Sequence, residues 1–361
     1  MKFNKFALSE LATIKYGKNQ KKVLSESGNV PIYGTGGLMG YATTSLYDKP
    51  SVLIGRKGTI GKVKYVEHPF WTVDTLFYTI VNTDIVLPKY LYYVMSLIDL
   101  NNYNEGTTIP SLRTETLNRL EFDIPSLVEQ ETILSCLNPI DEKIALNNAI
   151  NNNLEQQAQA IYQQMFIDNA SSDWTEGTLS DIADITMGQS PSGSSYNEDG
   201  NGTIFFQGRA EFGFRFPTVR LYTTEPKRMA CANDTLMSVR APVGDLNVAH
   251  TDCCIGRGLA AIHSKNNHQS FVLYTMFSLK KQLDVFNGEG TVFGSINRNS
   301  LNEMPLLIPS SENLDEFEAL VAPLDAAIHN NYDEVCRLEQ LRDSLLPKLM
   351  SGELDVSDIE I

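Results

Sequence analysis

The chain has 361 residues, of which 42% are hydrophobic and 20% are charged. This length allows two or three domains with substantial cores, and the composition excludes a largely disordered protein. The chain has no run of about 18 apolar residues and no apolar signal-peptide core at its N-terminus, so we expect a cytoplasmic protein without a membrane-spanning helix. The net charge of −15 argues, at face value, against a nucleic-acid-binding protein.

Short strands and one buried helix are predicted for the first part of the chain. β-branched and aromatic runs predict strands at residues 51–55, 62–66 and 75–81. Residues 34–40 are rich in glycine, but they lack the G-x-G-x-x-G spacing and a following helix, so we interpret them as a turn. The apolar run at residues 89–98 predicts a buried helix.

A heptad seam follows this mixed part of the chain. From Leu137 to Met165, seam residues recur in alternating steps of three and four. Pro139 suits the first turn of this long helix, and a separate, shorter amphipathic helix is predicted before it at about residues 127–137. Asn147 lies in the seam, where a polar residue costs stability but fixes the register of a pair.

The second half of the chain repeats the first half. Residues 8–17 match residues 179–188 at an offset of 171, and residues 124–126 match residues 308–310 at an offset of 184. The offset therefore grows along the chain, and the extra residues of the second copy are expected in the polar loop at residues 190–202.

The second copy has its own buried helix, predicted at residues 270–279, and its own heptad seam from Val321 to Leu349. An offset of 184 places Asn331 of the second seam at the position of Asn147. Two long helices with matching seams in one chain are expected to pair as an antiparallel coiled coil. The predicted pairing residues are Ile140, Ile144, Asn147, Leu154, Ile161, Leu324, Ile328, Asn331, Val335, Leu338 and Leu345.

These patterns predict an α+β (mixed α/β) fold with two repeated globular domains separated by two long paired helices. The predicted boundaries are a first globular domain at residues 1–125, a central helical spacer at 126–172, a second globular domain at 173–309 and a C-terminal helical spacer at 310–361. The 28 residues from Pro139 to Phe166 span about 42 Å as a helix, and DNA half-sites one helical turn apart lie about 34–36 Å from each other. That length suits a ruler between two DNA-reading heads, and it equally suits a coiled coil that only stiffens the protein.

The negative charge is concentrated in the two helical regions. The net charge is +3 for residues 1–125 and −3 for residues 173–309, whereas residues 126–172 carry −5 and residues 310–361 carry −10. The globular domains are neutral together and can still present basic grooves, while the acidic helices suit a protein partner. The total charge therefore no longer excludes DNA binding, although we expect the isolated chain to bind DNA poorly.

Ten motifs, each weak alone, occur in a specific order. They are Leu8–Ala12, Val52–Gly58, Phe70–Thr75, Gly106–Pro110 and Ile124–Glu131 in the first copy, and Met187–Pro191, Phe206–Gly208, Met237–Gly244, Cys254–Leu259 and Leu345–Leu354 in the second. In these motifs, in their duplication and in its two heptad helices, the chain resembles the specificity (S) subunit of Type I restriction–modification enzymes over essentially its full length.

The resemblance implies that the globular domains are target-recognition domains, each for one half of a split double-stranded DNA target. It implies that the helices fix the spacer and dock two methyltransferase (modification) subunits, and it allows restriction (motor-nuclease) subunits as further partners. Two departures are noted. Gly290–Ser295 differs from its counterpart Gly106–Ser111, so we expect a different loop shape, and Ser310–Asn313 replaces the Glu129–Gln130 pair, so we expect the two helical parts to dock a partner unequally.

Catalytic and metal-binding patterns are not evident in the chain. It has no Pro-Pro dipeptide and therefore lacks the Asn/Asp-Pro-Pro-aromatic motif that the resemblance implies for the amino-methylating enzymes of such systems. The five cysteines form no C-x-x-C pair, and the run from His250 to Cys254 lacks the four-ligand spacing of structural zinc. We therefore expect a non-catalytic chain without a metal or cofactor, and S-adenosylmethionine (AdoMet) on the partner methyltransferase.

Specific DNA readout uses Arg or Lys toward guanine and Asn or Gln toward adenine. The candidates are Arg56, Lys57, Lys62, Lys64 and Arg113 in the first domain, and Gln207, Arg209, Arg215, Arg240, Arg257 and Arg298 in the second. Arg56 and Arg240 are favoured because the repeat aligns them, although any of these side chains can instead be a solvated charge or a salt-bridge partner. Tyr33, Tyr41 and Phe212 are expected to pack and not to stack on bases.

Two other classes of function fit the same pattern. The chain can be a protein-interaction or decoy scaffold that keeps the two-domain shape without reading DNA. It can also be an independent regulator that binds a bipartite DNA site.

Overall fold

The computed structural model describes residues 1–288 and 294–356. The chain divides into unit 1, which joins Met1–Ala145 to the segment from Val335 onward, and unit 2, which is Leu146–Glu334. The boundaries of these units fall inside the two long helices, so each unit contains a globular part and a segment of both helices. Within the described part of the chain, no helix combines the length and the apolar character needed to cross a membrane.

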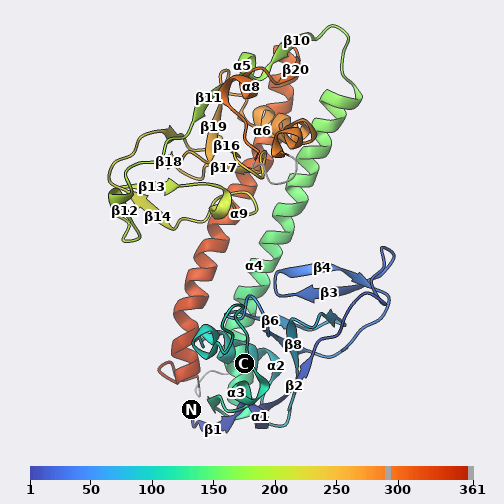
Figure 1. Ribbon diagram of the computed structural model, residues 1–361, viewed down its shortest axis with the longest axis vertical. Helices are drawn as coiled ribbons and strands as arrows, with labels where there is room; N and C mark the ends of the chain where they lie inside the picture. The colour runs from blue at the N-terminus through green and yellow to red at the C-terminus, as the bar shows by residue number, and fades with distance from the viewer. Residues whose placement is uncertain (289–293, 357–361) are drawn as a thin grey trace. The chain divides into compact units, whose positions relative to one another are not determined.

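Unit 1 is built around an antiparallel four-stranded sheet in the order β2-β8-β5-β6 (Figure 1). These strands are β2 (Ala12–Tyr16), β5 (Ser51–Gly55), β6 (Val63–Val66) and β8 (Leu76–Val81). Every residue of β5 is buried, because this strand has a neighbour on each side and helix α2 (Pro88–Ser96) packs against it. The strands predicted at 51–55, 62–66 and 75–81 and the helix predicted at 89–98 are therefore confirmed.

A smaller sheet, β4-β3-β7, flanks this core. Strands β3 (Val30–Gly34) and β4 (Gly37–Ala42) form a hairpin, and β7 (Trp71–Thr72) runs parallel to β3. The hairpin turns between Gly34 and Gly37, and Gly37 has a φ of +113°, which glycine adopts without strain. The turn predicted at residues 34–40 is therefore shorter than expected, because residues 37–40 belong to strand β4.

The remaining elements of unit 1 connect the sheets to the long helices. They are β1 (Asn4–Ala7), α1 (Leu8–Leu11), the short 3-10 helix η1 (Leu100–Tyr103), α3 (Thr114–Asn118) and β9 (Glu121–Ile124), and β1 pairs antiparallel with β9. The core of this unit combines Phe77 and Tyr90 of the globular part with Leu137 of one long helix and Leu349 of the other. Burial of such side chains contributes about 1.5–3 kcal/mol each and holds the globular part on both helix segments.

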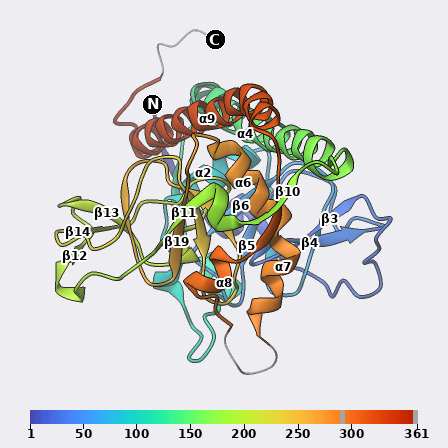
Figure 2. The same cartoon turned by 90° about the horizontal axis from the view of Figure 1, so that it is seen from above.

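Unit 2 repeats this plan. Its sheet β11-β19-β16-β17 corresponds to the four-stranded sheet of unit 1, and helix α6 (Gln269–Ser278), at the position predicted, lies between that sheet and a long helix (Figure 2). Its second sheet, β12-β14-β13-β18-β15, is larger than that of unit 1. The polar loop predicted at residues 190–202 includes β12 (Tyr196–Asn197), which pairs with β14, so the extra residues add a strand there.

The other elements of unit 2 have the following bounds. The strands are β10 (Thr175–Thr178), β11 (Ala183–Met187), β13 (Thr203–Phe206), β14 (Leu221–Thr223), β15 (Met229–Ala230), β16 (Thr235–Ser238), β17 (Leu246–Val248), β18 (Cys253–Ile255), β19 (Leu259–Ser264) and β20 (Pro305–Ile308). The helices are α5 (Leu179–Ile182), η3 (Gly193–Ser195), η4 (Arg209–Glu211), α7 (Lys280–Leu283), η5 (Asp284–Asn287) and α8 (Arg298–Asn302).

The long helices are α4 (Leu127–Tyr162), which continues as a π-helix at Gln163–Asp168, and α9 (Ser311–Ser351). The prediction of a separate helix at residues 127–137 is wrong, because α4 runs through Pro139 without a break. A proline inside a helix costs about 3 kcal/mol. Leu137 before the proline and Ile144 after it are both buried, and this packing offsets the cost.

The two helices pair antiparallel within each unit, as predicted. In unit 2, Asn147 Nδ2 donates to Glu334 Oε2 at 2.8 Å and Asn331 Nδ2 donates to Asn151 Oδ1 at 2.9 Å. In unit 1, Arg342 Nη1 lies 3.4 Å from Asp141 Oδ1. In these pairs the residue number falls on α9 as it rises on α4, which defines opposite directions. None of the eleven predicted pairing residues is exposed.

Candidate nucleic-acid interface

The loop after β5 gathers three of the predicted basic residues of unit 1. The Leu112 amide donates to the Arg56 carbonyl at 2.9 Å, and Lys57 forms a β-bridge with Ser111. Arg113 follows directly, so Arg56, Lys57 and Arg113 lie at neighbouring backbone positions. Lys57 and Arg113 are exposed, and Arg113 Nε also pairs with Glu105 at 3.2 Å.

Arg56 is held more firmly than its neighbours. Its Nη1 donates to the Asp74 carbonyl at 2.8 Å, and its guanidinium lies 5.0 Å from the centroid of the Tyr16 ring. A cation over an aromatic face gains roughly 0.5–2 kcal/mol. These contacts position the loop that presents Lys57, so Arg56 is suited to a supporting role.

Lys62 and Lys64 lie at the edge strand β6. Lys62 is exposed beside Gly61, whereas the ammonium of Lys64 lies 3.9 Å from the centroid of the Tyr33 ring. Partial burial of the Lys64 ammonium lowers its pKa. Partial burial of the Tyr33 hydroxyl raises the pKa of that group. Tyr33 is buried, as expected for a packing residue, while Tyr41 is exposed.

Three predicted residues of unit 2 come together at one edge of its second sheet. Strands β13 and β18 are parallel, so their carboxyl ends meet at the same edge. Gln207 follows β13 directly, and Arg257 lies two residues after β18. Arg240 joins them, because the Val239 amide donates to the Gly258 carbonyl at 2.9 Å. All three side chains are exposed.

Of two other predicted residues of unit 2, Arg298 lies close to this group and Arg209 forms an ion pair. Arg298 begins α8, two residues after Ile296, whose amide donates to the Val239 carbonyl at 3.1 Å. Arg209 Nε instead pairs with Asp245 at 2.9 Å. The loop departure predicted for Gly290–Ser295 falls largely on residues 289–293, which lie outside the described residues.

The prediction that Arg215 contacts DNA is wrong. Its side chain is 4% exposed, and its Nη2 donates to the Tyr274 hydroxyl at 2.8 Å and to Asp325 Oδ1 at 2.5 Å. A guanidinium enclosed in this way is not accessible to a base or a phosphate. Burial by itself lowers the pKa of Arg215, but the neighbouring Tyr274, Asp325 and Glu155 raise it, so the group stays charged.

The proposed equivalence of Arg56 and Arg240 is also wrong, by one residue. Lys57 bridges Ser111 in unit 1, and Arg240 bridges Ser295 in unit 2. The residue of unit 1 that is structurally equivalent to Arg240 is therefore Lys57. The sequence match aligned the two arginines because it ignored the one-residue change of offset within this region.

The Glu129–Gln130 pair lies at the start of α4 and bonds to residues of unit 1. Gln130 is fully buried, and its side chain bonds to the Leu87 amide at 2.8 Å and to the Ile85 carbonyl at 2.9 Å. Glu129 accepts from the Ser126 amide at 2.9 Å and so begins α4 with a capping contact. Both residues attach the helix to its own globular part.

Sequence reasoning missed a pair of anchors between the buried helices and the long helices. Tyr93 of α2 donates a hydrogen bond to Asp141 of α4, and Tyr274 of α6 donates to Asp325 of α9. Burial is the largest cause that raises the pKa of both tyrosine hydroxyls, so they remain protonated donors. The sequence signal for these anchors was the repeat itself, which aligns Asp141 with Asp325 at the offset of 184.

The comparisons with known proteins agree with this repeated architecture. The model of the family described as Type I restriction modification DNA specificity domain matches residues 1–156 and again residues 171–334. The MjaX specificity subunit of Methanocaldococcus jannaschii, named for a type I restriction enzyme, is 30% identical over 298 residues, which are 76% of this chain and 70% of that protein. The MjaIX specificity subunit of the same organism is 26% identical over 352 residues, 87% of this chain and 80% of that protein.

A solved structure has the same fold. The S subunit of a Type I restriction–modification system from M. genitalium superposes with a TM-score of 0.61 at 18% identity, covering 97% of this chain and 96% of that one. The resemblance seen in the motifs is thereby confirmed. The chain belongs to the family of Type I restriction modification DNA specificity domains, and it contains that domain twice.

Proposed function

We propose that this chain is the DNA sequence-specificity subunit of a Type I restriction–modification complex, and that each recognition domain reads one half of a bipartite target. The observation that carries this proposal is the repeated placement of one exposed cation. Lys57 in unit 1 and Arg240 in unit 2 follow equivalent strands and bridge equivalent serines.

The chemistry of the gathered side chains supports base readout. Arg and Lys donate to guanine O6 and N7, and Gln forms a bidentate pair with adenine. Unit 2 presents Gln207, Arg240 and Arg257 at one sheet edge, whereas unit 1 presents Lys57 and Arg113 beside one loop. The two domains therefore present different donor sets, which suits two different half-sites.

The paired helices are proposed to fix the spacer between the half-sites and to dock two methyltransferase subunits. Their acidic charge supports a role toward protein, because it repels phosphate. On this proposal the chain is non-catalytic and carries no cofactor, AdoMet is bound by the methyltransferase, motor-nuclease subunits join in a restriction complex, and the assembly acts in the cytoplasm.

Co-expression with the methyltransferase subunit, followed by methylome sequencing, tests the proposal. The expected result is co-purification of both subunits and methylation of one bipartite sequence. Sequence-specific DNA protection by the chain alone, without methylation, would instead support an independent regulator. Co-purification without any methylated sequence would support a protein-interaction or decoy scaffold.

A further inference from the structure

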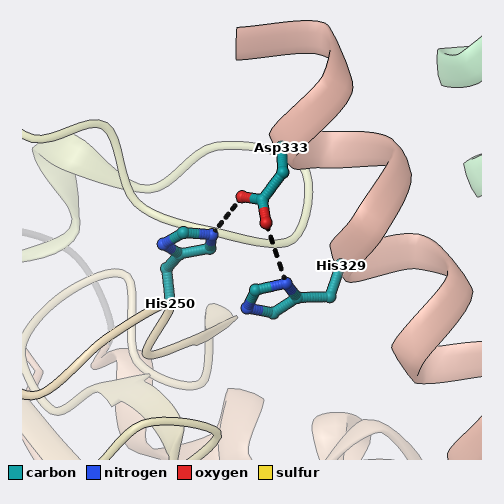
Figure 3. A group of neighbouring side chains, drawn as sticks. All are labelled: His250, His329 and Asp333. Atoms are coloured by element: carbon teal, nitrogen blue, oxygen red, sulfur yellow. Dashed lines mark hydrogen bonds and ion pairs between the residues drawn. The ribbon is translucent and has the colours of Figure 1, made fainter. Parts of the chain in front are cut away.

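Three polar side chains of unit 2 converge at a point that the DNA-reading role does not use. His250 lies in the loop after β17, and His329 and Asp333 lie one turn apart on α9 (Figure 3). His250 Nε2 is 2.7 Å from Asp333 Oδ1, and His329 Nδ1 is 3.5 Å from Asp333 Oδ2. One nitrogen or oxygen of each residue lies within 4.8 Å of the other two.

The two imidazole rings are held in place by aromatic neighbours. They stack with their centroids 4.4 Å apart and their planes 12° apart. The buried ring of Phe216 meets both edge-on, with centroids 5.2 Å from His250 and 5.1 Å from His329. This packing limits the rotamers of both histidines, so the nitrogen atoms are positioned before any ligand binds.

An ordinary His–Asp pair does not require this arrangement. In the same unit, His268 Nε2 lies 2.8 Å from Asp315 as a simple pair with one imidazole. Here two imidazoles share one carboxylate, which is a common ligand set for zinc and related metals. Tetrahedral bonds of about 2.0–2.2 Å place neighbouring zinc ligands roughly 3.3–3.6 Å apart. The 3.5 Å distance from His329 Nδ1 to Asp333 Oδ2 lies in that range, whereas the 2.7 Å distance from His250 Nε2 to Asp333 Oδ1 is a hydrogen-bond distance that must lengthen when an ion enters.

The site is open enough to receive an ion. The side chains of His250, Asp333 and His329 are 30%, 36% and 29% exposed. His329 also lines a cavity of about 440 Å³ beside Arg215 and Phe216. Three protein ligands leave a coordination position for water, which this exposure can supply.

From this geometry we propose that His250, His329 and Asp333 bind one divalent transition-metal ion, with Zn²⁺ as the ion of choice. His250 belongs to the globular part of unit 2, whereas the other two ligands belong to α9. The ion would therefore clip the loop after β17 to the helix. The first copy has Glu67, Ala145 and Ala149 at the matching sequence positions, so the clip is specific to the second recognition domain.

Metal titration of the full chain, freed of metal by chelation, tests the proposal. Zn²⁺ is added during calorimetry and thermal unfolding, and Co²⁺ is used separately for its visible absorption. We expect one Zn²⁺ per chain, a rise in Tm on binding, and a Co²⁺ spectrum that reports nitrogen and oxygen ligands. His250→Ala and His329→Ala should each weaken Zn²⁺ binding by more than tenfold.

His268→Ala is the matched control, because it removes a histidine from a two-residue pair in the same unit. It should leave the stoichiometry and the Zn²⁺ affinity unchanged. If an alanine variant has a lowered Tm without metal, Asp333→Asn decides, because it keeps the shape of the side chain and weakens the ligand. Equal Zn²⁺ binding by the wild-type chain and by the ligand variants, or no binding by the wild-type chain, overturns the proposal.

Discussion

The hydroxyl of Tyr274 lies 2.8 Å from Oδ1 of Asp325 and donates a hydrogen bond to it. The same oxygen accepts from Arg215, so a buried helix of the recognition domain, a loop of that domain and the long helix α9 meet at one carboxylate. Unit 1 has the corresponding Tyr93–Asp141 hydrogen bond, where the cations near the carboxylate are Lys89 and Arg342. The anchor is thus repeated, while the source of its positive charge differs.

Arg215→Met should destabilise the chain by about 1–3 kcal/mol, because it leaves the half-buried Asp325 carboxylate without its ion-pair partner. The measurement is the free energy of unfolding from urea titration. Lys5→Met is the control, since the exposed Lys5–Glu121 pair should contribute less than about 1 kcal/mol. A stable Arg215→Met protein that has lost its DNA specificity would restore Arg215 as a DNA contact.

Arg240→Ala should weaken methylation at one half-site by roughly 5–150-fold, because a bidentate contact to guanine contributes about 1–3 kcal/mol. Lys57→Ala should act in the same way on the other half-site. Both variants should still assemble with the methyltransferase subunit, which size-exclusion chromatography checks. The exposed Lys265 follows the end of β19 that lies opposite to Gly258 and the Arg240 group, and Lys265→Ala provides the control. Loss of folding in Arg240→Ala would show that the residue is structural.

Glu155→Gln should stabilise the chain at pH 7. Burial raises the pKa of Glu155 above its ordinary value of 4.5, although Arg215 opposes the shift. The folded state therefore favours the protonated carboxyl, and the stability from this group is present below pH 4.5 and is lost as the pH rises through the raised pKa. The gain from glutamine, measured by urea unfolding, should shrink as the pH falls toward 4.5.

Glu142→Gln on the exposed face of the same helix is the control for this experiment and should show no such gain. A Glu155→Gln protein that is less stable than wild type at pH 7 would contradict the prediction. That result would mean that attraction to Arg215 outweighs the cost of burying the carboxylate.

An insertion of seven residues into both α4 and α9 should lengthen the preferred DNA spacer by about 3 bp, because one heptad adds about 10.5 Å of helix. Methylome sequencing reads the spacer directly. An insertion of two residues rotates the following helix by about 200°, which breaks the phase of the seam and should abolish assembly. An unchanged spacer in the seven-residue variant would show that the helices do not set it.

Periodic features could be predicted from the sequence, because they repeat over many residues. The heptad seams are such a feature, because they extend over several turns of each long helix. The buried strand β5 could be predicted for another reason, because it is a short apolar run between turn signals. The burial of Arg215 could not be predicted, because its partner Asp325 lies 110 residues away in the chain. The contact between His250 and Asp333 could not be predicted for the same reason, because these residues are 83 positions apart.

The alignment of Arg56, in place of Lys57, with Arg240 has a local cause. Backbone bonds, which a residue alignment does not contain, define the equivalence of Lys57 and Arg240. The continuity of α4 through Pro139 depends on tertiary packing on both sides of the proline, which outweighs its local preference to begin a helix.

The division of the chain also has a consequence for its synthesis. Unit 2 is one continuous segment, whereas unit 1 combines Met1–Ala145 with a segment that is translated after unit 2. The core of unit 1 includes Leu346, Leu349 and Met350, and the amino group of Met1 pairs with Asp355 at 2.8 Å. The domain made first must therefore wait, with part of its core uncovered, until the segment that carries Leu346, Leu349 and Met350 has been translated.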